Sequence, residues 1–308
     1  MRRVSFVKSS PSGNVTILVR DASLTPMERA ASAAELMRPD HVVAEQAGFV
    51  NLLAVPPRLD MMGGEFCMNA TRSFAALLFG DGLLEAGPED WFCGIVSVSG
   101  MDGPLRVRVR GTAELCESHA LIDLPKRPPV RRVAEGICEV RVPGIVHLVL
   151  DAAVHPLPTD WERETAALFA RFDLLKEEAA GCIWLERKER PGEENGLALT
   201  PFVHVRETGT TCAETACGSG TLAAATVIWE ETGMETPLSI LQPGGDPLTV
   251  SPDVSRFAGG WAVWVGGSVL TVARGEAFVR CLGPIREEKN GAGELHPTES
   301  NEGPENSF

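Results

Sequence analysis

The chain has 308 residues, of which 44% are hydrophobic, and it carries 28 Lys and Arg against 42 Asp and Glu, a formal net charge of −14. A chain of this length and composition can bury a large core and can form two domains of ordinary size. The acidic balance and the scattered basic residues exclude nucleic acid and anionic membrane as expected partners, and they favour a small-molecule substrate.

The expected location is the cytoplasm. The N-terminal sequence MRRVSFVKSSPSGN contains no apolar signal segment, and no later stretch offers roughly 18 uninterrupted apolar residues. In a reducing compartment the eight cysteines are expected to be free thiols. Their spacings include no CxxC pair and the six histidines form no HxxxH pair, so no metal site is predicted.

The first half of the chain alternates between strand-like and helix-like segments. After short β-branched runs at the N-terminus, residues 24–39 are predicted to be a helix with a proline near its start, and residues 41–55 look extended. The apolar run 71–83 has helical spacing and stops at glycines, as a buried helix should. Strand-like runs follow, and the proline- and arginine-rich stretch 125–133 is interpreted as a loop near a domain boundary.

The second half repeats this plan. A strand over 146–151 precedes an amphipathic helix over 159–175, further strands follow, and a glycine-flanked cysteine opens a second apolar helix over 221–232. Strands return on both sides of the turn 243–246. The tail over 286–308 is polar and almost free of large apolar residues, so it is predicted to be disordered.

The repeat is clearest where a cysteine opens each apolar helix. EFCMNAT and TACGSGT place Cys67 and Cys217 at corresponding points, each with a glutamate shortly before it, Glu65 or Glu214, and a threonine four residues after it. Two half-chains with the same internal order predict two similar domains related by a pseudo-twofold axis. Both helix N-termini would then face a shared cleft.

Two facing helix N-termini would hold a carboxylate, because each presents unpaired N–H groups and the positive end of the peptide dipoles. The same field should lower the pKa of a cysteine from about 8.5 towards neutrality. One thiolate could remove an α-proton while the opposite thiol protonates the other face, which inverts the stereocentre. Cys67 and Cys217 are therefore predicted to be the catalytic acid and base, without pyridoxal phosphate, metal or nicotinamide.

Other candidates have simpler interpretations. Cysteines in strand-like runs are expected to be buried small hydrophobic residues: Cys93, Cys116, Cys138, Cys182 and Cys281. Cys212 lies five residues before Cys217 and could pair with it under oxidation. His147 and His155 are interpreted as polar residues of the surface or core. CGSGT lacks the lysine of a phosphate-binding loop, so nucleotide binding is not expected.

These motifs resemble the diaminopimelate epimerase superfamily, the cofactor-independent two-cysteine racemases and epimerases. The resemblance rests on SGN near the N-terminus, a cysteine–asparagine motif opening the first helix, ETACGSGT opening the second and a late PGG hairpin, and it extends to about residue 285. Within the superfamily, SPSGNVTILV, HVVAEQAGFV, GGEFCMNAT, ETACGSGT and LQPGGDPL look like segments of the histidine racemases that supply D-histidine for staphylopine-type metallophores.

The resemblance implies an α+β fold of two pseudo-twofold-related domains, each a curved, mostly antiparallel sheet wrapped around a central helix. The expected boundaries are 1–140 and 141–270, followed by a strand over 271–285 that returns to the N-terminal domain. The resemblance further implies a free amino acid as substrate, no cofactor and a homodimer.

Carried over by position, the resemblance also assigns a substrate site around Cys67 and Cys217. The groups expected to hold the α-carboxylate and α-ammonium are Asn69, Ala70, Gly218, Ser219 and Gly220. Asn14 and Gln46 match positions that line the pocket, and Glu214 resembles a cleft glutamate. Glu45 is a suitable partner for a basic side chain or an ammonium group.

Two positions depart from the superfamily pattern. Met68 replaces the glycine that usually follows the first cysteine and should crowd the first helix entrance, and Thr208 stands where diaminopimelate epimerases carry a substrate-gripping arginine. The leading hypothesis is a racemase that interconverts L- and D-histidine for an opine-type metallophore. The alternatives are a diaminopimelate epimerase, an isomerase of the phenazine-biosynthesis type, which works through a carboxylate, and a binding or redox-sensing protein on the same fold.

Overall fold

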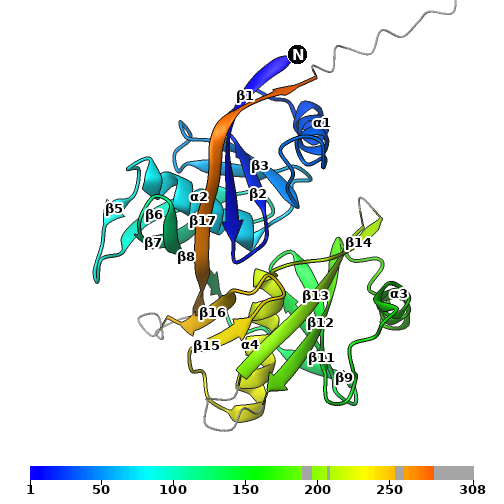
Figure 1. The fold of residues 1–308 in the computed structure, drawn as a ribbon. Helices are drawn as coiled ribbons and strands as arrows, with labels where there is room; N and C mark the ends of the chain where they lie inside the picture. Colours follow the sequence, from blue (N-terminus) through cyan, green and yellow to red (C-terminus); the bar gives the residue numbers. More distant parts are fainter. Residues whose placement is uncertain (189–195, 207–208, 254–259, 281–308) are drawn as a thin grey trace, which may run out of the picture.

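A computed structural model describes residues 1–188, 196–206, 209–253 and 260–280 of the chain. Two halves lie one above the other, and the long last strand β17 (Trp261–Val279) runs along both of them (Figure 1). Several predictions made from the sequence lie outside the described residues: the disordered tail 286–308, Cys281, Thr208 and the end of the strand over 271–285.

The N-terminal half places most of its strands around one central helix, α2. Its strands are β1 (Arg2–Pro11), β2 (Thr16–Val19), β3 (Gln46–Asn51), β4 (Arg58–Met61), β5 (Glu85–Ala86), β6 (Phe92–Val98), β7 (Leu105–Gly111) and β8 (Leu115–Leu124). Its helices are α1 (Pro26–Leu36) and α2 (Met68–Gly80). A capping box between Thr25 and Glu28, with a proline in the first turn, fixes the start of α1.

The C-terminal half is arranged in the same way around α4. Its strands are β9 (Val130–Ala134), β10 (Ile137–Val142), β11 (Ile145–Asp151), β12 (Ala179–Lys188), β13 (Gly196–Val205), β14 (Thr210–Ala213), β15 (Leu238–Leu241) and β16 (Pro247–Pro252). Its helices are α3 (Trp161–Arg171) and α4 (Gly218–Thr232). Gly233 ends α4 in the left-handed conformation, at φ 68°.

The same order of strand pairings occurs in both halves. The crossover between two parallel strands contains an outer helix, α1 between β2 and β3 and α3 between β11 and β12. The next parallel pair is joined by a crossover that contains the central helix, α2 between β4 and β6 and α4 between β13 and β15. The other pairings of the described strands are antiparallel. The chain is therefore an α+β protein.

The two central helices are enclosed, because helices that are apolar on every side are stable only when buried. All side chains from Met68 to Leu78 in α2 are buried, as are those from Gly220 to Trp229 in α4. Both helices contribute to one hydrophobic core that draws on strands of both halves. The outer helices α1 and α3 bury only one face each, against two smaller clusters.

The connection between the halves differs from the prediction at one end. Residues 125–129 form a loop, but Val130–Ala134 is strand β9, so the prediction of a single loop over 125–133 is wrong for its second part. The strand tolerates its arginines because they are exposed. Arg131 lies directly opposite Glu139 on β10 and forms an ion pair with it.

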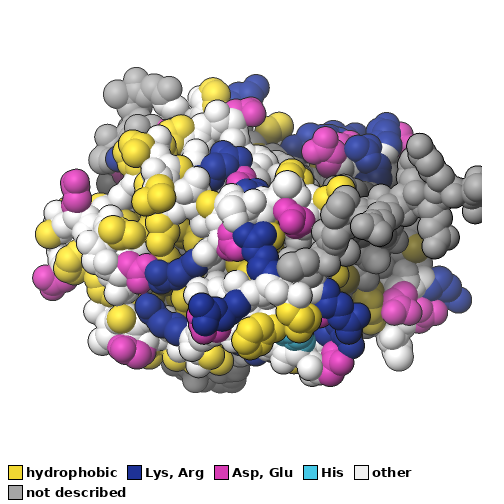
Figure 2. Space-filling view, turned by 90° about the horizontal axis from the view of Figure 1, so that it is seen from above, with side chains coloured by type: hydrophobic (Ala, Val, Ile, Leu, Met, Phe, Trp, Pro, Cys, Tyr) yellow, Lys and Arg dark blue, Asp and Glu magenta, His cyan; other side chains and the backbone are white. Residues whose placement is uncertain are grey.

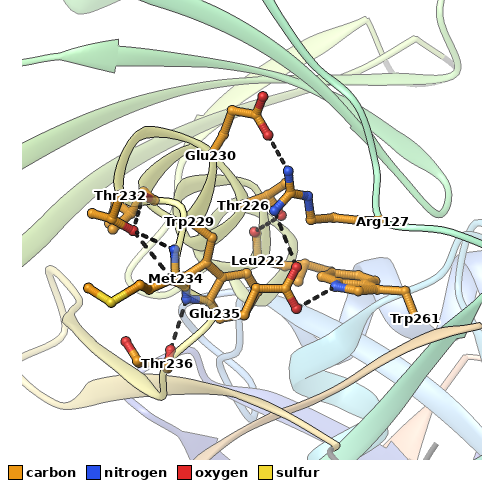
Figure 3. Close-up of polar contacts among 11 residues, drawn as sticks. Arg127, Leu222, Thr226, Trp229, Glu230, Thr232, Met234, Glu235, Thr236 and Trp261 are labelled. Carbon is orange, nitrogen blue, oxygen red and sulfur yellow. Dashed lines mark hydrogen bonds and ion pairs between the residues drawn. The ribbon is translucent and has the colours of Figure 1, made fainter. Parts of the chain in front are cut away.

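Both connections between the halves are tied to the C-terminal end of α4 (Figure 3). Arg127 of the loop forms ion pairs with Glu230 and, at 3.2 Å, with Glu235. The other carboxylate oxygen of Glu235 accepts a 3.1 Å hydrogen bond from the indole of Trp261, the first residue of β17. The loop and the long strand are therefore held at one point.

The surface carries both signs of charge. Seen from above, the described part of the molecule shows Lys and Arg side chains beside Asp and Glu side chains (Figure 2). Ion pairs of this kind include Arg2 with Asp21 and Arg20 with Asp81, both at 2.7 Å. Among the described residues, none of the helices combines the length and the apolarity that a membrane span needs.

Candidate active site

Cys67 and Cys217 are the N-cap residues of α2 and α4, with nearly the same backbone conformation. The φ and ψ angles are −128° and 115° at Cys67 and −134° and 105° at Cys217. Each sulfur accepts a 3.4 Å hydrogen bond from the backbone N–H three residues later, that of Ala70 or Gly220. In each helix the threonine at plus four donates its hydroxyl to the cysteine carbonyl. The same local interactions thus place one thiol at the N-terminus of each central helix.

The two helix N-termini meet between the halves. The side-chain amide of Asn69 donates a 2.8 Å hydrogen bond to the carbonyl of Ala216, the residue before Cys217. A Cβ built on Gly218 would lie 2.5 Å from Cγ of Met68, so the methionine side chain rests on the glycine backbone. Met68 therefore contacts the opposite helix.

A chain of hydrogen bonds leads from Cys67 to the other half. The thiol donates to Oε1 of Gln46 at 2.9 Å, and Nε2 of Gln46 donates to Oδ1 of Asn14. Nδ2 of Asn14 donates to Glu45 at 2.8 Å, and Glu45 accepts a further 2.9 Å bond from the hydroxyl of Thr215. Three of the predicted site residues, Asn14, Glu45 and Gln46, thus lie in one network with Cys67.

The surroundings of Cys217 include two residues for which the sequence predicts no site role. Its backbone N–H donates to Oε1 of the buried Gln242 at 3.0 Å. Its sulfur lies 3.4 Å from the hydroxyl of Ser219, which lies 3.0 Å from Nε2 of His147. His147 is fully buried, and burial lowers its pKa to about 3, so the ring is neutral.

Sequence signals for these two residues were weak. Gln242 stands directly before the PGG turn, which packs on the site through a 2.7 Å bond from Gly244 N–H to the carbonyl of Thr215. The correspondence between Gln46 and Gln242, one glutamine oxygen beside each cysteine, could have identified it. For His147 the sequence offered only a polar residue in an apolar strand.

Burial dominates the electrostatics of the two thiols. Although part of Cys67 reaches solvent, its sulfur lies deep among protein atoms, and desolvation raises the pKa of the thiol to about 12. Burial, with the carboxylate of Glu214, also raises the pKa of Cys217 well above its ordinary value. Hydrogen bonds from the helix N–H groups act in the opposite direction. The predicted pKa near neutrality is therefore wrong for this closed arrangement, because desolvation outweighs the helix N-terminus.

Glu214 lies close to Cys217 and is partly buried. Burial raises the pKa of its carboxyl group to about 7, and the charge of Glu45 acts in the same direction, whereas a hydrogen bond with Cys217 opposes it. A carboxyl group with this pKa can exchange a proton with a neighbouring thiol near neutral pH. Glu214 therefore places a carboxyl group that titrates near neutral pH beside Cys217.

One hydrogen-bond acceptor at the site is unpaired. Within the described residues, Oδ1 of Asn69 is buried and has no hydrogen-bond partner.

The described cysteines are unbridged, including Cys212, which is exposed on β14. Cys116, Cys138 and Cys182 are buried as expected, whereas Cys93 is only partly buried.

Comparison of the sequence with known proteins identifies a family. Residues 3–278 match the model of the family described as the histidine racemase CntK N-terminal domain. The chain is 27% identical over 251 residues to a histidine racemase of Fusobacterium nucleatum subsp. nucleatum, covering 79% of this chain and 86% of that protein. It is 26% identical over 294 residues to a histidine racemase of Staphylococcus aureus, covering 90% and 98%.

Solved structures with much lower identity share the fold. A hydroxyproline epimerase from Agrobacterium vitis with bound trans-4-OH-L-proline superposes with a TM-score of 0.61 at 9% identity, covering 90% of this chain and 92% of that chain. A phenazine biosynthesis protein of the PhzF family from Bacillus anthracis gives 0.60 at 15% identity, covering 91% and 100%. Since the family match spans nearly all described residues, the chain belongs to the histidine racemase CntK N-terminal domain family and is an amino-acid racemase, an isomerase.

Proposed function

We propose that this racemase interconverts L- and D-histidine, that Cys67 and Cys217 are its acid and base, and that it needs no cofactor. The paired N-cap geometry of the two cysteines carries the proposed mechanism. The choice of histidine is supported by the family match and by the histidine racemases that align with most of the chain.

The proposal includes finer points that rest on the sequence resemblance. These are a diaminopimelate epimerase-like fold with domains over 1–140 and 141–270, a cytoplasmic homodimer, and the supply of D-histidine for an opine-type metallophore. The shared order of pairings in the two halves supports the fold assignment.

The substrate α-carboxylate would bind between the N-termini of α2 and α4, close to residues 69–70 and 218–220. Backbone N–H groups and helix dipoles favour an anion there. The α-ammonium would donate to Oδ1 of Asn69, a buried acceptor that has no partner within the described residues. This arrangement would hold Cα between the two cysteines.

Inversion then requires one thiolate and one thiol. The thiolate takes the Cα proton, the electron pair left on Cα is delocalised into the carboxylate, and the opposite thiol gives its proton to the other face. The two cysteines finish with exchanged protonation states. Glu214, which forms a hydrogen bond with Cys217, would take up the thiol proton only transiently, because its pKa of about 7 lies below that of the thiol.

Glu45 is the proposed partner of the substrate imidazole. Its carboxylate is fixed by donors from both halves, the amide of Asn14, the N–H of Val15 and the hydroxyl of Thr215. A carboxylate held in this way can accept a hydrogen bond from an imidazole N–H. Its position between the halves would orient the side chain relative to the two thiols.

Solvent exchange tests the mechanism. In deuterium oxide, the enzyme should introduce deuterium at Cα of L-histidine while optical rotation is lost. Cys67→Ser and Cys217→Ser should each reduce racemisation by about 100-fold or more, whereas Cys212→Ser, which changes an exposed cysteine, should retain it. Racemisation near the wild-type rate in either of the first two variants would rule out the two-thiol mechanism.

A substrate panel tests the choice of amino acid. Histidine, diaminopimelate and proline are compared by the same exchange assay at equal concentrations. Fastest exchange with histidine supports the proposal, and fastest exchange with diaminopimelate replaces it with the epimerase alternative. Binding of histidine without exchange would support the alternative of a ligand-binding protein that does not racemise histidine.

A further inference from the structure

The two helix openings differ at the residue that follows the cysteine, which is Met68 in α2 and Gly218 in α4. Met68 is only 4% exposed, and Gly218 is buried. A Cβ added to Gly218 would lie 2.5 Å from Cγ and 2.7 Å from Cβ of Met68. The methionine therefore occupies the space that a side chain on α4 would fill.

The contact between Met68 and Gly218 joins two helix N-termini, which repel each other electrostatically. Each N-terminus carries a partial positive charge of about +0.5 and several N–H groups without intrahelical partners. A thioether adds no charge and adapts its shape to the available space. The bond from Asn69, the residue after Met68, to the carbonyl of Ala216, the residue before Cys217, lies beside this contact.

We propose that Met68 is a positioning residue that sets the spacing between Cys67 and Cys217, with Gly218 as its contact surface. This inference rests on the proposed two-thiol function. Met68 and Gly218 are the direct chain neighbours of the two cysteines, so a shift at their contact moves the sulfur atoms. A thiol is needed on each face of one carbon, and a misplacement of about 1 Å can cost about 100-fold in rate.

This role of Met68 differs from the one that the sequence suggests. The sequence predicts a side chain that crowds the entrance of its own helix. Its contact with Gly218 places it between the two helices instead. Replacing it by glycine, the usual residue of the superfamily, should therefore leave the helix ends without their spacer.

A size-exchange series tests the contact. Met68→Leu keeps the volume and should stay within about threefold of the wild-type kcat, whereas Met68→Gly should lower kcat at least about tenfold. Gly218→Ala alone should lower kcat by a similar factor, because its methyl group meets Met68. In a Met68→Ala background, Gly218→Ala should lower kcat by less than about threefold, because the added methyl group no longer meets the long methionine side chain. The effects of the two substitutions on kcat would then be non-additive. Purely additive effects would overturn the proposal.

A second measurement reports the spacing without turnover. In a Cys212→Ser background, diamide takes up the two electrons and two protons released when Cys67 and Cys217 form a disulfide, which peptide mapping identifies. Met68→Gly and the milder Met68→Ala should form it several-fold faster than wild type, and Met68→Leu should match wild type. Equal rates in all four proteins would overturn the proposal.

The two experiments separate this inference from the proposed function. If the serine variants of Cys67 or Cys217 racemise histidine normally, the two-thiol mechanism fails while the disulfide rates still measure the spacing. If the serine variants are inactive but the Met68 series shows neither coupling nor altered disulfide rates, the mechanism stands and the positioning role of Met68 is wrong.

Discussion

Asn69 on α2 donates a 2.8 Å hydrogen bond to the backbone carbonyl of Ala216, the residue that precedes Cys217 on the other half. The side chain two residues after one cysteine thereby holds the backbone beside the other. Asn69 is 4% exposed and Ala216 is 0% exposed, so the bond is shielded from water. The bond therefore stabilises the packing of the two halves on each other, and it also fixes the backbone next to Cys217.

Asn69→Ala should reduce the free energy of unfolding by about 1–3 kcal/mol, because the buried carbonyl of Ala216 loses its donor. Urea denaturation measures this loss. Ser73→Ala on the same helix is the matched control, since the hydroxyl of Ser73 is buried without a hydrogen-bond partner in the described residues. The control should not reduce the free energy, because removing an unpaired buried hydroxyl also removes its desolvation cost, and an equal loss in both variants would contradict the role given to Asn69.

Glu214 should give racemisation a pH dependence near neutrality. Burial raises the pKa of its carboxyl group to about 7, so the ionised form that can accept the proton of Cys217 becomes more populated as the pH rises through 7. We expect kcat/KM to increase over this range. Glu214→Gln should lower the activity and remove this step, and a pH profile that keeps the step in the variant would assign it to another group.

His147 should make folding stability sensitive to acid. Burial lowers its pKa in the folded state to about 3 from the ordinary 6.5. Between these values the unfolded chain binds more protons, so stability is retained above about pH 6.5 and decreases as the pH falls, by up to about 1.4 kcal/mol per unit. Urea denaturation between pH 4 and 7 measures the slope. His147→Asn should flatten it, and an unchanged slope would show that other groups cause the effect.

Two interactions at the end of α4 should differ in strength because their burial differs. Arg127 and Glu230 have side chains that are 32% and 51% exposed, so Arg127→Met should cost at most about 1 kcal/mol. Trp229 is fully buried, and its indole donates a 2.8 Å bond to the carbonyl of Thr236 (Figure 3). Trp229→Phe should cost about 1–3 kcal/mol. Thermal unfolding in which Arg127→Met is the more damaging change would reverse this order.

The sequence alone was sufficient for the elements whose causes are local. The apolar runs that become α2 and α4 could be identified because a helix that is hydrophobic on every side must be enclosed, and Pro26 with the Thr25–Glu28 capping box marks the start of α1. The shared context of Cys67 and Cys217 also lies within a few residues of each cysteine. Local patterns of this kind need no knowledge of the rest of the chain.

Only the tertiary structure decided the features that depend on distant residues. The thiol pKa values rise because the two halves enclose the cysteines, and desolvation by remote atoms cannot be inferred from a helix start. The contact of Met68 with Gly218 and that of His147 with Ser219 join segments far apart in sequence. The motif thus determines which side chains stand at each helix N-terminus, whereas the packing of one half on the other determines their spacing and their charge.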